Sequence, residues 1–323
     1  MDPEQFFAAS RLVIVAGKGG VGKTTVSATL ARAAALAGLS TLIVEVEGKT
    51  GLPGMFAHGE LGYDEVVLSA GGGPDGAADV RARTLTADAA LLEYLQDHGL
   101  SRISRRLVSS GALDVVATAA PGIKDILLLG KVKQLERAGA ADLIVLDAPA
   151  AGHAITFLQS ARSLLDTVSV GPINAQARDV LALLEDHRRC QVVLVTIPEE
   201  TPVNEAVETA FSLEDRVGVG LGPIVVNGVY PELSGLDADP VAAAEAAGVS
   251  LRAGEAETLA AAAAFRRSRA ALHEEQVGRL QAALPLPQVR LPFLFTTDIG
   301  PDELEALARC LLDEIAALPG LPA

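Results

Sequence analysis

Residues 17–25 combine glycines, a lysine and hydroxyl side chains at spacings that suit phosphate binding. They read Gly-Lys-Gly-Gly-Val-Gly-Lys-Thr-Thr, which fits the pattern G-x-x-x-x-G-K-[ST] from Gly17 to Thr24. Glycines permit a tight turn that directs several backbone N–H groups at a phosphate, and a following helix end favours an anion. Lys23 would place a charge between the β- and γ-phosphates, and the Thr24 hydroxyl would ligate Mg²⁺.

The residues on either side give this loop the context that it needs. A short β-branched apolar run, 12–15, precedes the loop, and a helical pattern, 24–37, follows it. A chance glycine-rich turn would not combine both flanks, so the segment predicts a binding site for a nucleoside triphosphate, expected to be ATP. The residues expected to bind it here are Gly17, Gly19, Gly20, Val21, Gly22, Lys23, Thr24 and Thr25.

A second group of residues suited to phosphate chemistry follows another apolar run, 142–146. Asp147 comes directly after this run, and Gly152 lies five residues further on. A carboxylate at the end of a buried strand can hold a magnesium-bound water, and a nearby glycine amide can sense the γ-phosphate. We therefore expect Asp147 to complete a metal site with Thr24, and Gly152 to bind the nucleotide.

Lys18, directly after the first glycine, gives the loop the form G-K-G-G-x-G-K-[ST]. This form resembles the deviant loop of ATPases such as the arsenite-pump ATPase, the tail-anchored-protein targeting factor, MinD, ParA and nitrogenase iron protein. The segment 147–153, Asp-Ala-Pro-Ala-Ala-Gly-His, is similar to the Asp-Thr-Ala-Pro-Thr-Gly-His switch of the first two, so the chain is identified as a member of the ArsA-like anion-transporting ATPases. The resemblance implies a nucleotide-sandwich dimer in which Lys18 reaches the partner's phosphates, much as an arginine finger does.

The segment after the run 41–46 departs from the family pattern. Family members carry Asp-Pro-Ala-His there, and the Asp positions the attacking water, whereas this chain has Glu47-Gly-Lys-Thr. The extra methylene moves the carboxylate by about 1 Å, and a misplacement of that size can cost about a hundredfold in rate. The resemblance thus implies that Glu47 is the catalytic carboxylate of a slow ATPase, unless the backbone at Gly48 adjusts. The Glu-Gly-Lys variant resembles actinobacterial members of the family.

Three further segments resemble nucleotide contacts of the family and occur in the family's order. Glu205, with residues 196–200, resembles the segment that contacts nucleotide across the dimer. Asn227 resembles the strand-end asparagine that reads adenine, since an amide can pair with both donor and acceptor edges of the base. Pro292 and Phe293 resemble the loop that closes over the adenine ring.

The elements that must position these residues alternate between short apolar runs and helical patterns. This alternation predicts an α/β fold with a doubly wound, mostly parallel sheet. The expected strands are 12–15, 41–46, 142–146, 191–197, 223–226 and 289–291, and the expected helices are 24–37, 154–166, 174–187, 203–216 and 255–283. Residues 66–69 and 80–85 flank a glycine-rich segment and predict an edge hairpin with a mobile tip. Alanine-rich residues 241–265 are expected to be helical.

We expect a single phosphate-loop ATPase domain over residues 1–323, with an all-helical insertion over 88–139, where strand signals vanish. The insertion contains apolar stripes, one of them Ile123, Ile126 and Leu127. Such a stripe would either pack onto the sheet or line a groove for a protein client. Because the phosphate loop occurs once, a second chain, identical or paralogous, must complete the dimer.

Composition restricts the partners. The net charge is −15 and the pI is near 4.8, which argues against nucleic-acid binding. The acidic final helical pattern, 301–318, disfavours a membrane surface, and no apolar stretch approaches eighteen residues. No signal peptide is evident, so we expect a cytoplasmic protein that does not insert into membranes. Cys190 and Cys310 form neither a disulfide framework nor a metal motif.

Two other functions remain open on the residues alone. A nucleotide-gated binding or scaffold protein with little turnover would bind ATP without releasing phosphate and would need a paralogous subunit. A small-molecule kinase or synthetase on the same loop would show a substrate-stimulated rate, but the switch-like segment 147–153 argues against it. The cysteine motifs that bind arsenite or bridge zinc in the family are absent, so the client stays unnamed.

Overall fold

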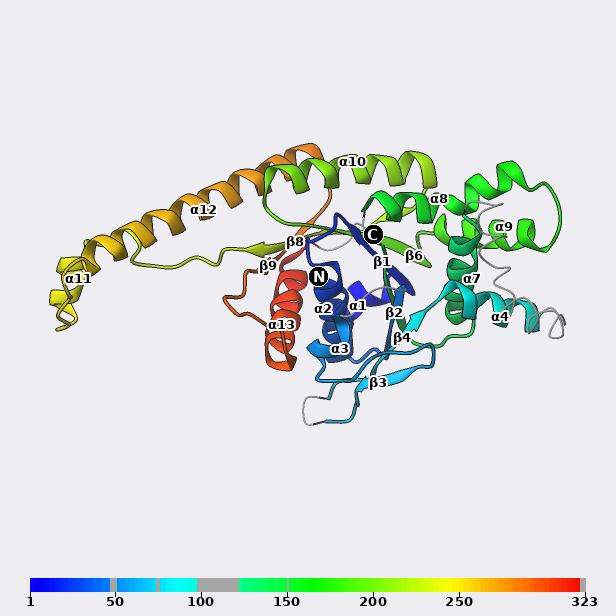
Figure 1. Cartoon of the computed structure of the whole chain (residues 1–323), viewed down its shortest axis with the longest axis horizontal. Coiled ribbons are helices and arrows are strands. Elements are labelled where there is room, and N and C mark those ends of the chain that lie inside the picture. The colour runs from blue at the N-terminus through cyan, green and yellow to red at the C-terminus, as the bar shows by residue number, and fades with distance from the viewer. Residues whose placement is uncertain (47–50, 74–75, 98–121, 150, 320–323) are drawn as a thin grey trace.

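A nine-stranded sheet forms the centre of the structure (Figure 1). The computed structural model describes residues 1–46, 51–73, 76–97, 122–149 and 151–319. Within them the strand order is β3-β4-β2-β5-β1-β6-β8-β9, and β7 pairs with β6. Only β3 is antiparallel to its neighbour, so the predicted α/β fold with a mostly parallel sheet is confirmed.

The strands and helices agree closely with the expected ranges. The strands are β1 Leu12–Gly17, β2 Thr41–Val46, β3 Val66–Ser69, β4 Val80–Leu85, β5 Leu143–Asp147, β6 Cys190–Thr196, β7 Gly220–Leu221, β8 Ile224–Val229 and β9 Gln288–Pro292. The helices are α1 Pro3–Ala8, α2 Lys23–Leu36, α3 Leu52–Met55, α4 Ala87–Asp97, α7 Ile123–Arg137, α8 Ala151–Thr167, α9 Pro172–Leu184, α10 Glu200–Val217, α11 Pro240–Ala246, α12 Glu255–Ala283 and α13 Pro301–Ala317. The sequence pattern missed α1, α3 and β7, because each is too short to show a period.

Helices cover both faces of the sheet, which explains why its strands read as continuous apolar runs. Successive side chains of a strand point to opposite faces. Ile14 of β1 therefore lies in a core with residues of α7, α8, α9 and α10, whereas Val15 lies in a core with residues of α1, α2 and α13. The carboxyl ends of the central strands are thereby held at one rigid edge, where ligands bind in folds of this kind.

The alanine-rich segment differs from the expectation of a single helix over 241–265. It forms α11 and the start of α12, separated by residues 247–254. Gly248 and Gly254 have φ of +66° and +84°, a left-handed conformation that ends one helix and precedes the next. Together α11 and the first half of α12 extend away from the sheet (Figure 1).

The predicted hairpin is present at the edge of the sheet. β3 pairs antiparallel with β4, and β4 continues parallel to β2. Residues 74–75 of the expected tip lie outside the described residues.

Two helices represent the expected insertion over 88–139, whose residues 98–121 lie outside the described part. Both α4 and α7 are present, and α7 buries Ile126 and Leu127 in the core. Ile126 and Leu127 thus pack against the body of the protein, whereas Ile123 is partly exposed. In the part of the chain that the structure describes, no helix combines the length and apolarity that crossing a membrane requires.

Candidate nucleotide site

The phosphate loop connects the end of β1 to the start of α2, and its glycines are needed where it is most crowded. Gly20 and Gly22 have φ of +86° and +87°, which side-chain-bearing residues rarely adopt. A Cβ on Gly17 would lie 2.3 Å from the Val195 carbonyl oxygen, and one on Gly22 would lie 2.3 Å from Nδ2 of Asn227. The loop therefore passes closely over its neighbours in a shape that only glycine allows at these positions.

The loop leaves its outer backbone open and anchors its inner part. Gly19 and Gly20 are exposed, and Val21 is buried in the core that contains α2. The Thr25 carbonyl accepts a hydrogen bond from the Thr29 hydroxyl, which keeps the first turn of α2 intact. Nζ of the buried Lys23 donates to the Lys18 carbonyl oxygen at 2.9 Å, so its ammonium group is hydrogen-bonded to the loop backbone.

Thr24 and Asp147 meet at the sheet edge, as the sequence predicts. The Thr24 hydroxyl donates to Oδ2 of Asp147 at 2.7 Å, and the Asp147 side chain is fully buried at the end of β5. A hydroxyl and a buried carboxylate in contact form an all-oxygen donor set, which is the kind that Mg²⁺ prefers. The donor set present thus fits the metal that the loop pattern implies.

Glu45 is a second buried carboxylate beside this pair, and the sequence interpretation missed it. Glu45 of β2 is in register with Asp147 of β5, so both side chains point to the same face of the sheet. The Thr84 hydroxyl contacts Oε2 of Glu45 at 3.5 Å. An acidic residue inside the otherwise apolar run 41–46 was the available signal, since an isolated buried carboxylate would be costly.

Lys18 forms an ion pair within its own chain. Its Nζ lies 2.6 Å from Oε1 of Glu205 on α10, and both side chains are 38% exposed. The structure therefore brings together two residues that the family resemblance assigned separately to contacts across a dimer. In a single chain, Glu205 holds the Lys18 side chain in place.

Asn227 and Phe293 lie at the ends of neighbouring strands, β8 and β9. Asn227 Nδ2 donates to the Val21 carbonyl oxygen at 3.0 Å, which ties the end of β8 to the phosphate loop. Pro292 ends β9, and the Phe293 amide donates to the Val229 carbonyl oxygen at 2.8 Å. Phe293 is 41% exposed.

A further aromatic group surrounds Phe293, and the sequence interpretation did not include it. The Tyr230 ring lies 5.2 Å from Phe293, and Phe295 lies 4.9 Å from it, between ring centroids. The Arg266 guanidinium carbon lies 4.8 Å from the Tyr230 centroid and 4.6 Å from that of Phe295, in cation–π geometry. Nδ1 of the buried His273 accepts from the Tyr230 amide at 3.2 Å, and burial lowers the pKa of His273. These contacts connect α12 to Tyr230, directly after β8.

For two expected site residues, Gly152 and Glu47, the structure describes no side-chain contact. Gly152 is in the first turn of α8, which begins four residues after Asp147. Glu47 lies outside the described residues, so its role as the water-orienting carboxylate stays a prediction. The remaining site residues gather at the carboxyl ends of β1, β5, β6, β8 and β9.

Comparisons of the sequence with known proteins show what this chain is similar to. The profile of the anion-transporting ATPase family matches residues 10–170. ATPase BagA of Mycobacterium tuberculosis is 34% identical over 252 residues, which cover 76% of this chain and 73% of the relative. A putative arsenical pump-driving ATPase of Halobacterium salinarum is 27% identical, over 69% of this chain and 36% of its own. ATPase GET3 of Pyricularia oryzae is 26% identical, over 46% of this chain and 43% of its own.

Proposed function

The chain belongs to the anion-transporting ATPase family and is an ATPase, and we propose that it hydrolyses MgATP as one half of a two-chain nucleotide sandwich. One observation carries this proposal: the Thr24 hydroxyl meets the buried Asp147 carboxylate directly beneath the phosphate loop. Hydrolysis would open and close the dimer and so act on a partner or protein client.

Phosphate binding rests on the loop and Lys23. Backbone N–H groups of residues 19–25 and the helix end of α2 would hold the β- and γ-phosphates. Lys23 would exchange its hydrogen bond to the Lys18 carbonyl for the phosphate oxygens, since a charged acceptor binds an ammonium group more strongly than a carbonyl does.

Magnesium would be held by Thr24 directly and by Asp147 through water. The ion supplies positive charge to the β- and γ-phosphate oxygens, which lowers the cost of charge that develops on them. Glu45, in register with Asp147, would add a second acceptor for magnesium-bound water. Glu47 would orient the attacking water, as the family resemblance implies.

Adenine recognition would use the ends of β8 and β9. Asn227 can present its amide to the base edge, and Phe293 with Pro292 can cover the ring. ATP is supplied in the cytoplasm, which is where we place the activity.

The second half-site would come from an identical or paralogous chain. The ion pair of Lys18 with Glu205 is partly exposed, so a partner's phosphates could compete for Lys18. A partner that released Lys18 would bring its charge to the transition state in trans.

Phosphate release from MgATP, measured together with molar mass in solution, tests the proposal. Wild-type protein is compared with Lys18→Ala, Lys23→Ala and Thr24→Ala, and with Lys124→Ala on α7 as a control of equal charge change. We expect turnover and an ATP-dependent dimer that the first three variants lose and the control keeps.

Turnover that Lys18→Ala leaves intact would contradict the sandwich. ATP binding without turnover by the isolated chain would instead support a nucleotide-gated half that needs a paralogous subunit.

A further inference from the structure

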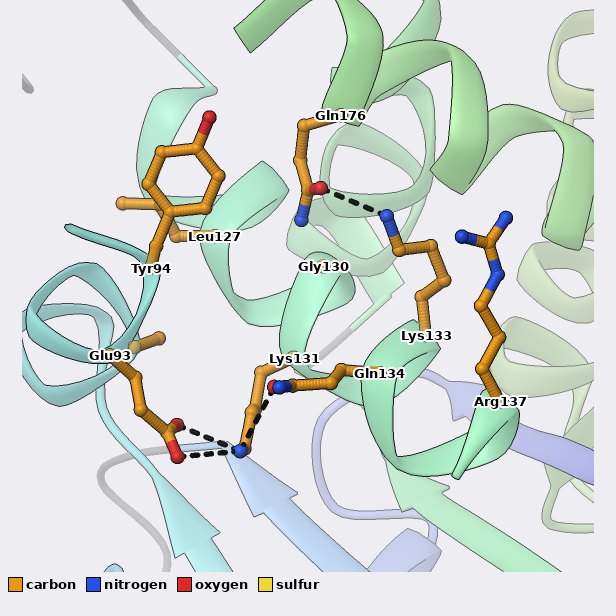
Figure 2. Close-up of a pocket in the computed structure, with 10 residues that line it drawn as sticks. Glu93, Tyr94, Leu127, Gly130, Lys131, Lys133, Gln134, Arg137 and Gln176 are labelled. Carbon is orange, nitrogen blue, oxygen red and sulfur yellow. Dashed lines mark hydrogen bonds and ion pairs between the residues drawn. The ribbon is translucent and has the colours of Figure 1, made fainter. Parts of the chain in front are cut away.

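A cavity of about 230 Å³ lies among the helices α4, α7 and α9, and the ATPase site described above makes no use of it. Figure 2 shows the side chains that surround it. Its polar lining includes Glu93, Tyr94, Lys131, Lys133, Arg137 and Gln176. A space of this size, with about 30 Å³ for each liquid water, could hold a few water molecules or one small ion.

Three cations on α7 border this space, and two of them are almost fully buried. The side chains of Lys131 and Lys133 are each 9% exposed, and Arg137 is more open. Burying an ammonium group is costly unless it is paired. Lys131 pairs with Glu93 at 2.8 Å, while Lys133 and Arg137 share Asp179, each at 3.1 Å. Among the residues that the structure describes, these three positive charges thus share two carboxylates, in a chain whose net charge is −15.

The Glu93 carboxylate is already hydrogen-bonded, so its negative charge does not strongly repel an anion in the cavity. Its carboxylate accepts from Nζ of Lys131 and from the Tyr63 hydroxyl, at 2.8 and 2.5 Å. Burial alone would raise the pKa of Glu93, but these hydrogen bonds lower it below its ordinary value. The wall formed by α4 therefore carries a negative charge that is already neutralised.

Gly130 makes room for an amide donor at the cavity wall. Oε1 of Gln176 accepts from Lys133 at 2.9 Å, which orients the amide, and a Cβ on Gly130 would lie only 1.7 Å from Nε2 of Gln176. The φ angle of Gly130 is not positive, so the backbone of the helix does not require a glycine there. Glycine in a helix interior costs about 1 kcal/mol relative to alanine. Its presence keeps two amide N–H donors beside the ammonium group of Lys133.

We propose that this cavity binds one small oxyanion, a phosphate or a small carboxylate. The Lys133 ammonium, the Arg137 guanidinium and the Gln176 amide supply the donors, and each can bond a charged oxygen. The bound ion balances the third positive charge of the cluster. The site lies on the helical layer and is separate from the phosphate loop.

Calorimetric titration of inorganic phosphate, and separately of malonate, tests this inference. The titrations use the full chain, Lys133→Met, Gly130→Ala and Lys23→Ala, with Lys124→Met as a control. Gly130→Ala favours the helix but pushes the Gln176 amide into the cavity, and Lys124→Met removes the same charge from α7 outside the cavity. In Lys23→Ala, where the phosphate loop is impaired, we expect one equivalent of anion to bind. Lys133→Met and Gly130→Ala should weaken binding at the cavity about tenfold or more, and Lys124→Met should keep it.

Tyrosine resonances locate the bound anion independently. The chain has three tyrosines, Tyr63, Tyr94 and Tyr230, so 3-fluorotyrosine labelling gives three fluorine signals that Tyr→Phe variants assign. The anion should shift the Tyr94 signal and leave that of Tyr230 unchanged. Binding of phosphate alone or malonate alone would identify the oxyanion class. No binding of either anion, binding lost in Lys23→Ala, or a Tyr94 signal that does not move would overturn the proposal.

Discussion

Thr24 and Asp147 are 123 positions apart, yet their oxygen atoms lie 2.7 Å from each other. At the scale of single residues, this contact suits a divalent cation, because a cation can be coordinated by both oxygens, directly or through water. The Lys18–Glu205 pair is of another kind. It joins two partly exposed side chains, and such pairs are weak enough to be exchanged for a stronger partner.

Asp147→Asn should separate metal use from folding. The amide keeps the shape of the carboxylate but loses its charge, so we expect phosphate release to fall about 10- to 100-fold and to need more magnesium. Measuring the rate against magnesium concentration checks this. Asp142→Asn, just before the same strand, is the matched control, because Asp142 is exposed and accepts hydrogen bonds from Ser40. Equal rates of phosphate release in the two variants would show that Asp147 does not hold the metal.

Glu205→Gln tests whether Glu205 only restrains Lys18 or itself contacts the nucleotide or the partner chain. If Glu205 only restrains Lys18 within a chain, its loss should strengthen nucleotide-dependent dimerisation by up to about fivefold, since an exposed pair is worth at most about 1 kcal/mol. Sedimentation with saturating nucleotide measures this, and Glu208→Gln on the exposed side of α10 is the control. Weaker dimerisation would show that Glu205 itself contacts nucleotide or partner, as the family resemblance implies.

At the scale of elements, α12 has two different halves. Its first half extends from the body, with Leu259 half exposed, whereas its second half packs into the core through the fully buried Leu280 (Figure 1). Between these halves, Arg266 and His273 contact Tyr230, which directly follows β8. The helix is thus anchored at one end and presents the other to solvent.

The same substitution in the two halves should have unequal effects. Leu280→Ala is expected to cost about 2–5 kcal/mol of unfolding free energy, because it removes buried contacts and leaves a cavity. Leu259→Ala should change it by no more than about 0.5 kcal/mol. Urea unfolding of both variants measures the difference. A large loss in Leu259→Ala would mean that the exposed half is covered in solution.

The link between α4 and α7 should weaken in acid. Hydrogen bonds from Lys131 and Tyr63 hold the pKa of Glu93 below its ordinary value of 4.5. A carboxyl whose pKa is lower in the folded state stabilises the fold above about pH 4.5, and this stability is lost as the pH falls through the folded value. Glu93→Gln should therefore lower the melting temperature at pH 7, with a difference from wild type that shrinks below pH 4.5.

Asp88→Asn on α4 is the control for Glu93, because Asp88 is exposed. Its effect on the melting temperature should stay small at every pH. A Glu93→Gln difference that is unchanged between pH 7 and pH 4 would show that packing, and not charge, is what the residue contributes.

At the scale of the whole molecule, the sheet positions the site and the surface charge governs association. Cores on both faces hold the strand ends rigidly, so the phosphate loop, the Thr24–Asp147 contact and Asn227 keep their spacing. Two chains of net charge −15 repel each other when they approach. Dimer formation must overcome this repulsion through nucleotide and interface contacts.

Salt should therefore favour the dimer. The Debye length falls from about 30 Å at 0.01 M to about 8 Å at 0.15 M ionic strength, which screens repulsion between chains. With saturating nucleotide, we expect the dimer dissociation constant, measured by sedimentation, to decrease over this range. An increase instead would indicate an interface held by attractive ion pairs.

The sequence alone determined the phosphate-loop motif, a carboxylate at the end of β5 and the alternation of strands and helices. These features depend on residue types at short spacing: glycines for a tight turn, apolar runs for buried strands, and a carboxylate at a strand end. The sequence pattern did not predict the break at residues 247–254, because alanine is compatible with a helix throughout and a glycine ends a helix only where its φ becomes positive, as at Gly248 and Gly254.

Only the tertiary structure decided which distant side chains meet. Strand register set Glu45 beside Asp147, and the packing of α10 against the loop gave Lys18 a partner 187 positions away. The cations of α7 likewise border a cavity only because α4 and α9 pack beside them. Such contacts depend on packing between elements, and no local pattern in the chain encodes the rotamer or the neighbour that packing selects.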